Sequence, residues 1–230
     1  MGPKGIFRKA RKEKRNVLTV SEALEVIKKY EIPVAEYKLV KKVEDAIEFA
    51  NKIGYPVVLK VVSPQLIHKI DVGGVFLDIE SKSELQEAFR QAENNLRKIP
   101  NVSIHGFLVQ KMISDGVEMI IGGKHDQQFG PFILTGMGGV LVEVYEDLSI
   151  RFPPITKEDA LEMLKELKGY KILKGYRGRP LADLDELSGI IVKLGELMLK
   201  EKAIREIDVN PVIVLHKGAS AVDARIVLEG

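Results

Sequence analysis

One short stretch of the sequence, residues 57–79, brings together residue types that handle phosphate. Lys60 lies inside the apolar run VVLKVV, His68 follows in a loop, and the pair Gly73-Gly74 precedes a second apolar run. A lysine among apolar neighbours needs an anionic partner, because lysines are almost never fully buried unless they are paired. Two glycines let a backbone approach a phosphate closely, and a neutral imidazole can attack a phosphoryl group. This stretch would therefore support phosphate binding and phosphoryl transfer.

Each of these residue types also fits a structural role without chemistry. A lysine on an edge strand can extend its ammonium group to water, a pair of glycines can form a plain turn, and a histidine can lie in a surface loop. The stretch does not match the Walker A pattern, and no GxGxxG fingerprint occurs anywhere in the chain. The interpretation therefore depends on residues elsewhere in the sequence.

Oxygen-bearing side chains gather near the C-terminus, at Glu206, Asp208, Asn210 and Asp223. Asp208 and Asn210 are two residues apart, so on a strand both point to the same face, and Asp223 can reach that face from a partner strand. Hard oxygen ligands of this kind suit Mg²⁺, which takes one or two protein ligands together with substrate phosphates. A polar strand face in water is the alternative interpretation.

Earlier predicted strands add two further candidates. Glu143 could supply another metal ligand, and Arg151 could supply a phosphate contact. The glycines of the run TGMGG mark a loop that passes close to another group; they are Gly136, Gly138 and Gly139.

The apolar periodicity predicts the elements that must position these residues. Helices are expected after a capping box at 19–22, over 43–53 with Gly54 as terminator, after a capping box at 83–86, and over about 157–167 and 185–200. Strands are expected at 36–40, 57–62, 75–79 and 106–112. The second half adds the short strands VEMIIGG, PFILTG, VLVEVY and SIRFPP, which favour a mainly antiparallel sheet. The closing runs REIDVNPVIVL and ASAVDARIVL resemble a β-hairpin.

These elements predict an α+β protein with two lobes. The composition changes near residue 106, so we expect a basic tail at 1–16, a first lobe at 17–105 and a second lobe at 106–230. The first lobe would carry the histidine and the glycine loop, and the second would carry the oxygen ligands. A nucleotide could sit between the lobes, since domain interfaces are favoured ligand sites.

Composition excludes several classes of function. The net charge of +2 demands neither a nucleic-acid nor a membrane partner, and no apolar run approaches the roughly 20 residues that span a bilayer. The absence of cysteine excludes disulfides, thiolate catalysis and Cys-based zinc sites, and it fits a cytoplasmic setting. The abundance of lysine and glutamate, with no cysteine or tryptophan, is also typical of thermophile proteins.

The N-terminal segment, residues 1–16, is strongly basic, with Glu13 as its only acidic residue. We expect a solvated, poorly ordered arm. Binding of a polyanion is the alternative.

Several motifs occur in an order that resembles one known family. The segments are GYPVVLK, HKIDVGGV, QKMISDGVEMIIG, FGPFILTGMGG, VEVYEDLSIRFPP and DVNPVIV. Together they resemble the ATP-grasp β subunits of ADP-forming acyl-CoA synthetases, with the acetyl-CoA synthetases (acetate–CoA ligases) as the nearest group. The resemblance covers about residues 17–228, and Ile70 departs from the pattern HKSD that this loop often shows.

The resemblance implies an ATP-grasp fold and a role for each matching residue in the first lobe. Lys60, with the glycine pair Gly73-Gly74, would contact nucleotide phosphates, and His68 would carry phosphate between two sites. The strand at 109–113 would line the adenine pocket; its candidate residues are Gln110, Met112 and Ile113.

In the second lobe the resemblance implies the rest of a Mg-nucleotide site. Glu118 would bind on the ribose side. Asn210 and Asp223 match magnesium positions, with Asp208 beside them. Together with Mg²⁺ and Lys60, Arg151 would neutralise the charge of the transferred group.

The family reaction reversibly converts acyl-CoA, ADP and phosphate into the acid, CoA and ATP. The chain has no candidate CoA-binding Rossmann unit, so the resemblance implies a CoA-binding α subunit, in an α2β2 assembly. The loop around His68 has about ten residues and an extended length of about 33 Å, which permits a long swing between sites.

Three other functions stay open at this point. The first is a succinyl-CoA-type β subunit, and the second is a carboxylate–amine ligase, which the His68 loop argues against because that chemistry needs no phosphohistidine. The third is a non-catalytic nucleotide-binding module whose basic tail docks RNA or a partner.

Overall fold

The chain divides into two compact units, and each is described by itself. The computed structural model describes residues 1–66, 73–100, 102–139, 147–176 and 180–230. Unit 1 comprises Met1–Val34 and Asp115–Gly230, and unit 2 comprises Ala35–Ser114. This division differs from the boundaries expected after residues 16 and 105, because the N-terminal helices pack with the C-terminal part of the chain rather than with the first lobe.

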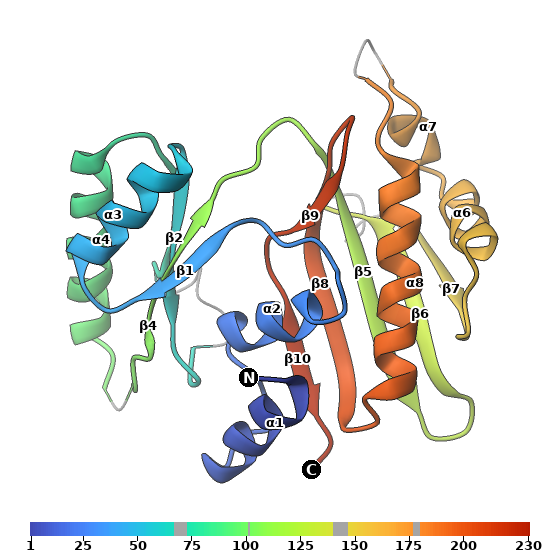
Figure 1. Cartoon of the computed structure of the whole chain (residues 1–230), viewed down its shortest axis with the longest axis horizontal. Coiled ribbons are helices and arrows are strands. Elements are labelled where there is room, and N and C mark those ends of the chain that lie inside the picture. The colour runs from blue at the N-terminus through green and yellow to red at the C-terminus, as the bar shows by residue number, and fades with distance from the viewer. Residues whose placement is uncertain (67–72, 101, 140–146, 177–179) are drawn as a thin grey trace. The chain divides into compact units, whose positions relative to one another are not determined.

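Unit 2 is a four-stranded antiparallel sheet with two helices on one face (Figure 1). In the strand order β1-β4-β2-β3, the strands are β1 (Tyr37–Val40), β4 (Gly106–Lys111), β2 (Val57–Val62) and β3 (Val75–Ile79). The helices are α3 (Val43–Ile53) and α4 (Lys82–Arg97), and α3 ends at Gly54 as expected. The predicted elements of this region are therefore confirmed.

The start of α4 differs from the predicted one. Its N-cap is Ser81, whose hydroxyl oxygen accepts a hydrogen bond from the Glu84 amide at 3.3 Å. The carboxylate of Glu84 in turn accepts from the Glu80 amide at 2.8 Å. The capping box predicted at 83–86 is thus wrong by two residues, because both Ser81 and Ser83 precede an apolar helical pattern and only the first has the extended backbone of a cap.

Alternation along β2 assigns its residues to the two faces of the unit 2 sheet. Val57, Leu59 and Val61 pack into the core with α3 and α4. Lys60 therefore points to the opposite face, and Gln110 of β4 shares that face because it lies directly opposite Val58. A slip of one residue would move the lysine into the core, so the apolar pattern fixes this register.

Unit 1 contains a second antiparallel sheet, in the strand order β10-β8-β5-β6-β7. The strands are β5 (Val117–Asp126), β6 (Gly130–Met137), β7 (Leu148–Arg151), β8 (Ile204–Val214) and β10 (Arg225–Leu228), and β9 (Ala219–Ala221) pairs with β8. The mainly antiparallel sheet is confirmed, and so is the closing hairpin, whose second strand divides into β9 and β10. The predicted strand VLVEVY, with Glu143, lies outside the described residues.

Helices cover one face of the unit 1 sheet (Figure 1). They include α2 (Val20–Lys28), α6 (Lys157–Glu166), α7 (Tyr170–Leu173) and α8 (Leu184–Lys200). Met198 of α8 lies over Gly123 of β5. A Cβ added to Gly123 would stand 2.9 Å from the Met198 side chain. Just after α2, the Tyr30 hydroxyl donates to the carboxylate of Glu201, beyond the end of α8, at 3.0 Å. In the part of the chain that the structure describes, no helix is long and apolar enough to cross a membrane.

The basic N-terminal segment is helical, so the expected poorly ordered arm is wrong. Helix α1 (Pro3–Lys12) buries Ile6, Phe7 and Ala10, which lie on one face at helical spacing. The following residues pair with the end of the chain: Leu18 donates to the Ile226 carbonyl at 3.0 Å, and Leu228 donates to the Asn16 carbonyl at 2.6 Å. The many cations of this segment outnumber its apolar residues, so the sequence pattern did not predict a buried face.

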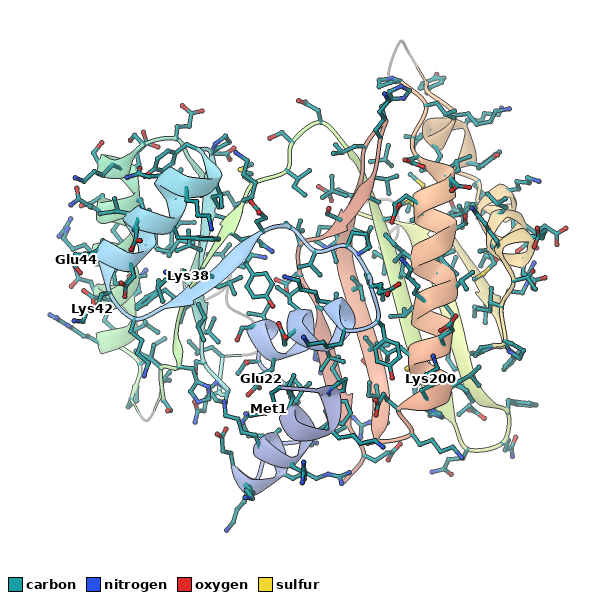
Figure 2. All side chains as sticks on the ribbon, in the orientation of Figure 1. Met1, Glu22, Lys38, Lys42, Glu44 and Lys200 are labelled. Carbon is teal, nitrogen blue, oxygen red and sulfur yellow. The ribbon has the colours of Figure 1, made fainter. Side chains whose placement is uncertain are left out.

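An ion pair between Arg15 and Glu22 joins the end of this segment to α2; Glu22 is labelled in Figure 2. Both guanidinium Nη atoms of Arg15 donate to the Glu22 carboxylate at 3.0 Å. Thr19 caps α2, and its amide donates to Glu22 at 2.9 Å, which confirms the predicted capping box. Burial alone would raise the pKa of Glu22, but the hydrogen bonds and charge of Arg15 and the hydrogen bonds of Thr19 lower it to about 2.

Candidate functional site

Two polar side chains are buried on the face of the unit 2 sheet opposite its helices. Lys60 is 6 % exposed and lies opposite Leu108 of β4 and Val75 of β3. Gln110 is 1 % exposed, and its Nε2 atom is buried without a hydrogen-bond partner in the described chain. An unsatisfied buried donor costs about 1–3 kcal/mol, so this amide favours a ligand that offers an acceptor. The arrangement suits an anionic ligand with further acceptor atoms.

The glycine pair lies directly beside the lysine-bearing strand. The Val61 amide donates to the Gly74 carbonyl oxygen at 2.8 Å, which closes the ladder next to Lys60. Gly73 has φ +60, and an added Cβ would stand 2.8 Å from the side-chain nitrogen of Asn95. The backbone conformation therefore favours glycine, and a Cβ at this position would displace the Asn95 amide. His68 and its neighbours at 67–72 lie outside the described residues.

The end of β4 holds the residues expected to line an adenine pocket. The Met112 amide donates to the Pro56 carbonyl at 3.2 Å, so this backbone N–H already has a partner. The Met112 sulfur accepts from the Asp78 amide at 3.4 Å, and Ile113 is half-buried. Because the Met112 N–H is already paired, other backbone groups near Met112 would have to make the hydrogen bonds to a base.

Lys111 fixes the turn that faces this strand end. Its ammonium group donates to the carbonyls of Gly54 at 3.0 Å and Tyr55 at 3.1 Å. Sequence reasoning missed this residue, because nothing in the spacing relates position 111 to a turn 56 residues earlier.

In unit 1, the glycine-rich run after β6 passes close to Glu118 of β5. The Gly138 amide donates to the Glu118 carbonyl at 2.7 Å, and a Cβ on Gly138 would stand 2.9 Å from the backbone of Glu118. Gly139 has φ +66, a conformation that favours glycine. The expectation that this run approaches another group is confirmed, and Glu118 is that group.

Of the oxygen ligands predicted for magnesium, Asp208 lies on the face of the unit 1 sheet away from α8, and Asn210 lies further along β8. Asp208 lies opposite Gly122 of β5 and Arg225 of β10, whereas Ile207 is buried on the helix-covered face. Asn210 follows two residues later and is exposed. The pairing of β8 with β5 shifts register between Val209 and Val212, so the expectation that Asp208 and Asn210 share a face stays a prediction.

Burial raises the pKa of Asp208 above the ordinary value of 3.8. The positive charge of Arg225 lowers it, and the charges of Glu206 and Asp223 raise it further. Asp223 is therefore electrostatically coupled to Asp208, although its carboxylate also accepts from the Ala224 amide at 2.8 Å. A partly buried carboxylate with a second carboxylate in its electrostatic surroundings is compatible with binding of a divalent cation.

The donor set fits Mg²⁺ that brings its own phosphate ligands. Among the described residues, no three His, Cys, Asp or Glu side chains form a complete metal cage. Magnesium is commonly bound by one or two carboxylates plus substrate phosphates, so a complete protein cage is not required.

Arg151 does not join this face. It lies opposite Ile133, which is buried on the helix-covered side, and both guanidinium Nη atoms contact the carboxylate of Glu166 on α6. The Glu166 carboxylate also accepts from the Ser149 hydroxyl at 2.6 Å. The structure therefore separates Arg151 from Asp208 by the thickness of the sheet.

Sequence reasoning also missed Asp147, which is 6 % exposed at the start of β7. Its carboxylate accepts from the amides of Lys168 and Gly169, each at 2.7 Å, and so fixes the turn between α6 and α7. These partners are 21 and 22 residues away, a separation that no local pattern encodes.

Comparisons with known proteins give consistent results over almost the whole chain. A family model described as an ATP-grasp domain matches residues 9–228. The subunit beta of the ADP-forming acetate–CoA ligase I from Pyrococcus furiosus is 47 % identical over 97 % of this chain and 96 % of its own length. The ADP-forming acetate–CoA ligase I of Archaeoglobus fulgidus is 46 % identical over 90 % of this chain, which corresponds to 30 % of that longer protein.

Solved structures agree with the sequence comparisons. The acetyl-coenzyme A synthetase 1 of Ca. Korarchaeum cryptofilum, in complex with coenzyme A and Ca-AMPCP, matches with a TM-score of 0.94 and 43 % identity over 98 % of this chain and 99 % of that chain. A second structure of that enzyme, with coenzyme A and Mg-AMPPCP, matches with a TM-score of 0.88 and 40 % identity over 99 % and 100 % of the two chains. It is described as having a phosphohistidine segment that points towards the nucleotide binding site.

Proposed function

The chain belongs to the family of ADP-forming acetate–CoA ligase β subunits, which is built on an ATP-grasp domain, and we propose that it passes a phosphoryl group through His68 to ADP. The support is the motif HKIDVGGV, together with the phosphohistidine segment of the related synthetase. In the proposed step an oxygen of the ADP terminal phosphate attacks the phosphorus on the imidazole. The P–N bond breaks, its electron pair returns to the ring, and the new P–O bond gives ATP.

In this proposal the residues of unit 2 bind and orient the nucleotide. Lys60 supplies a positive charge to its phosphates, and the glycine pair Gly73-Gly74 lets the backbone approach them. Gln110 offers its unpaired amide, and the backbone around Met112 and Ile113 lines the base. Phosphoryl transfer depends on positioning and charge neutralisation, which such groups supply.

Unit 1 carries the remaining residues to which the proposal gives a role. Asp208, Asn210 and Asp223 would hold Mg²⁺, and Glu118 would contact the ribose. The metal, when bound, would neutralise negative charge on the phosphates. We leave Arg151 out of this set, because its guanidinium is paired with Glu166 on the helix-covered face.

The observation that carries the proposal is the hydrogen bond between Val61 and Gly74, which joins the end of the histidine segment to the lysine-bearing strand at 2.8 Å. It anchors the chain after His68 beside Lys60. A phosphate carrier that delivers to a nucleotide near this lysine requires such an anchor.

The test uses the chain purified with its CoA-binding partner. Incubation with Mg-ATP labelled at the terminal phosphate should give acid-labile label on the chain, and His68→Ala should abolish both the label and ATP formation from acetyl-CoA, ADP and phosphate. His105→Ala is the matched control and should retain both. If His68→Ala kept full turnover and labelling, the relay would be refuted.

Two Pyrococcus furiosus relatives of this chain are named as β subunits, which implies partner subunits for those proteins. We propose a CoA-binding α subunit, in an α2β2 assembly in the cytoplasm. Light scattering of the co-purified complex checks the stoichiometry.

A further inference from the structure

The open face of the unit 1 sheet carries an apolar strip that the proposed site does not use. We define the strip as Phe129, Phe132, Leu148, Ile150 and Phe152, from the β5–β6 turn, β6, β7 and the residue after β7. The strip lies on the same face of the sheet as Asp208. Across the strands, Ile150 pairs with Leu134, Leu134 pairs with Gly122, and Gly122 pairs with Asp208. One face thus has a polar half on β8 and β10 and an apolar half on β6 and β7.

The strip is exposed to an unusual degree for such side chains. Phe129 is 71 % exposed, Phe152 56 %, Ile150 49 % and Leu148 42 %. Since an aromatic side chain presents about 150–250 Å² when fully exposed, the four together leave roughly 400 Å² of apolar surface in water. Contiguous patches of several hundred Å² on a soluble domain mark interaction sites.

The aromatic rings of the strip are held in place before any partner arrives. The Phe152 ring centroid lies 6.2 Å from that of Phe129 and 6.4 Å from that of Phe132. The turn that carries Phe129 is fixed by Asp126, whose carboxylate accepts from the Phe129 amide at 3.0 Å and from the Gln128 amide at 2.8 Å. Side chains ordered in advance lose little conformational freedom on binding, as a specific interface requires.

Strand β7, which carries part of the apolar strip, lies at an edge of the described sheet. It ends the strand order of the sheet, so one side of its backbone has no neighbouring strand within the described sheet. An exposed edge strand with apolar side chains promotes aggregation unless something covers it.

We propose that the apolar strip is the docking surface for the CoA-binding part of the enzyme, an inference that rests on the proposed function. In the Archaeoglobus relative, the part matching this chain is 30 % of one longer protein, so further parts of that enzyme are joined to it in one chain. A standard interface buries about 800 Å² per partner, so a strip of roughly 400 Å² would be its apolar centre with a polar rim around it. The partner would present aliphatic and aromatic side chains to Phe129, Ile150 and Phe152.

The test begins with the double variant Ile150→Ser with Phe152→Ser, co-purified with the CoA-binding subunit. Loss of two central apolar anchors should weaken the complex at least about tenfold in Kd. Leu181→Ser, which removes a side chain of similar exposure (48 %) elsewhere in unit 1, should leave the Kd unchanged. Mg-ADP affinity and Tm of the isolated double variant should match the parent chain, which shows that its fold is intact.

A footprint by thiol labelling gives a second measurement. The chain has no cysteine, so Ile150→Cys introduces a single thiol whose labelling rate should fall at least about tenfold in the complex, as expected for a central interface position. Leu181→Cys should label at the same rate with and without the partner. Protection of Cys at position 150 by Mg-ADP alone, or by a second copy of the chain in a concentration-dependent dimer, would overturn the proposal.

The outcomes separate this inference from the proposed function. If the parent complex forms ATP and the double variant binds the partner equally well, the docking surface is wrong and the function stands. If the parent chain supports no ATP formation with any CoA-binding subunit, the proposed function fails first.

Discussion

The side-chain amide of Asn95 on α4 donates to the carbonyl oxygen of Gly73 at 3.1 Å, directly after the segment that contains His68. Together with the Val61–Gly74 bond, it fixes where the chain leaves that segment. A neutral hydrogen bond of this kind contributes about 0.5–1.5 kcal/mol. Its role is therefore to position the glycine rather than to stabilise the whole fold.

The first prediction concerns this contact. Asn95→Ala should slow labelling of His68 by Mg-ATP about three- to tenfold, because a lost bond of about 1 kcal/mol lets the anchor move. Asn94→Ala, at the exposed neighbouring position on α4, is the control and should label at the parent rate. A fall in Tm for Asn95→Ala with no change in labelling would mean that the contact is purely structural.

The second prediction follows from the raised pKa of Asp208. An acid whose pKa is higher in the folded chain binds its proton more tightly there, so its contribution lowers stability as pH rises from 3.8 through the raised value. At pH 7, Asp208→Asn should therefore raise the Tm of the metal-free chain by about 2–4 °C while weakening Mg-ADP binding.

The pH dependence provides the check on Asp208. Thermal scans without Mg²⁺ should show the Tm difference shrinking as pH falls below 3.8, where the carboxyl is protonated in both states. Asp185→Asn, with a side chain that is 79 % exposed, should show no such gain. A destabilised Asp208→Asn chain at pH 7 would contradict the assignment of burial as the main cause.

The third prediction concerns Glu22, whose pKa is lowered from 4.5 to about 2 by Arg15 and Thr19. A lowered pKa adds stability above pH 4.5, and this contribution is lost as pH falls towards about 2. Glu22→Gln should therefore cost about 1–2 kcal/mol at pH 7 after allowance for solvent screening. Denaturant titrations at pH 7 and pH 3 measure the loss and its decrease.

Glu25→Gln is the matched control on the same helix. Glu25 pairs with Lys29 four residues later at 3.4 Å, with both side chains well exposed. Such pairs contribute about 0.3–0.5 kcal/mol. If both variants lost the same free energy of unfolding, the Arg15–Glu22 contact would contribute no more than the exposed Glu25–Lys29 pair.

The fourth prediction compares two glycines. Gly138→Ala should destabilise the chain by about 1–3 kcal/mol, because its Cβ would stand 2.9 Å from backbone atoms of Glu118, which cannot rotate away. Gly189→Ala should stabilise it by about 0.5–1 kcal/mol, since this position lies inside α8 with nothing within 4 Å of the added carbon. Denaturant midpoints measure both, and a neutral Gly138→Ala would show that this loop shifts freely.

Most elements of the fold could be predicted from local patterns. The helix over 43–53 and the strand over 57–62 were predicted at the residues where they occur, because periodicity, a terminating glycine and an apolar run agree there. Helix α1 was not predicted, because its cations outnumber the three apolar residues that it buries.

The candidate site was harder to predict than the fold. Strand alternation is a local rule, and it predicts a shared face for Asp208 and Asn210, but the register of β8 shifts just after Val209. The pairing of Arg151 with Glu166 depends on which face of the sheet α6 covers, and the sequence of β7 alone contains no information on that. For the same reason no pattern linked Asn95 to Gly73.

The hydrogen bonds between residues 16–18 and 226–228 have a consequence for synthesis on the ribosome. Residues 226–228 are synthesised long after residues 16–18, so the nascent N-terminal segment cannot form these hydrogen bonds until β10 has emerged. Unit 2 is complete once residue 114 has emerged and can form first. During that interval α1 and α2 can pack on one another before β10 is present, and the positive charge of residues 1–16 would favour keeping the segment in water.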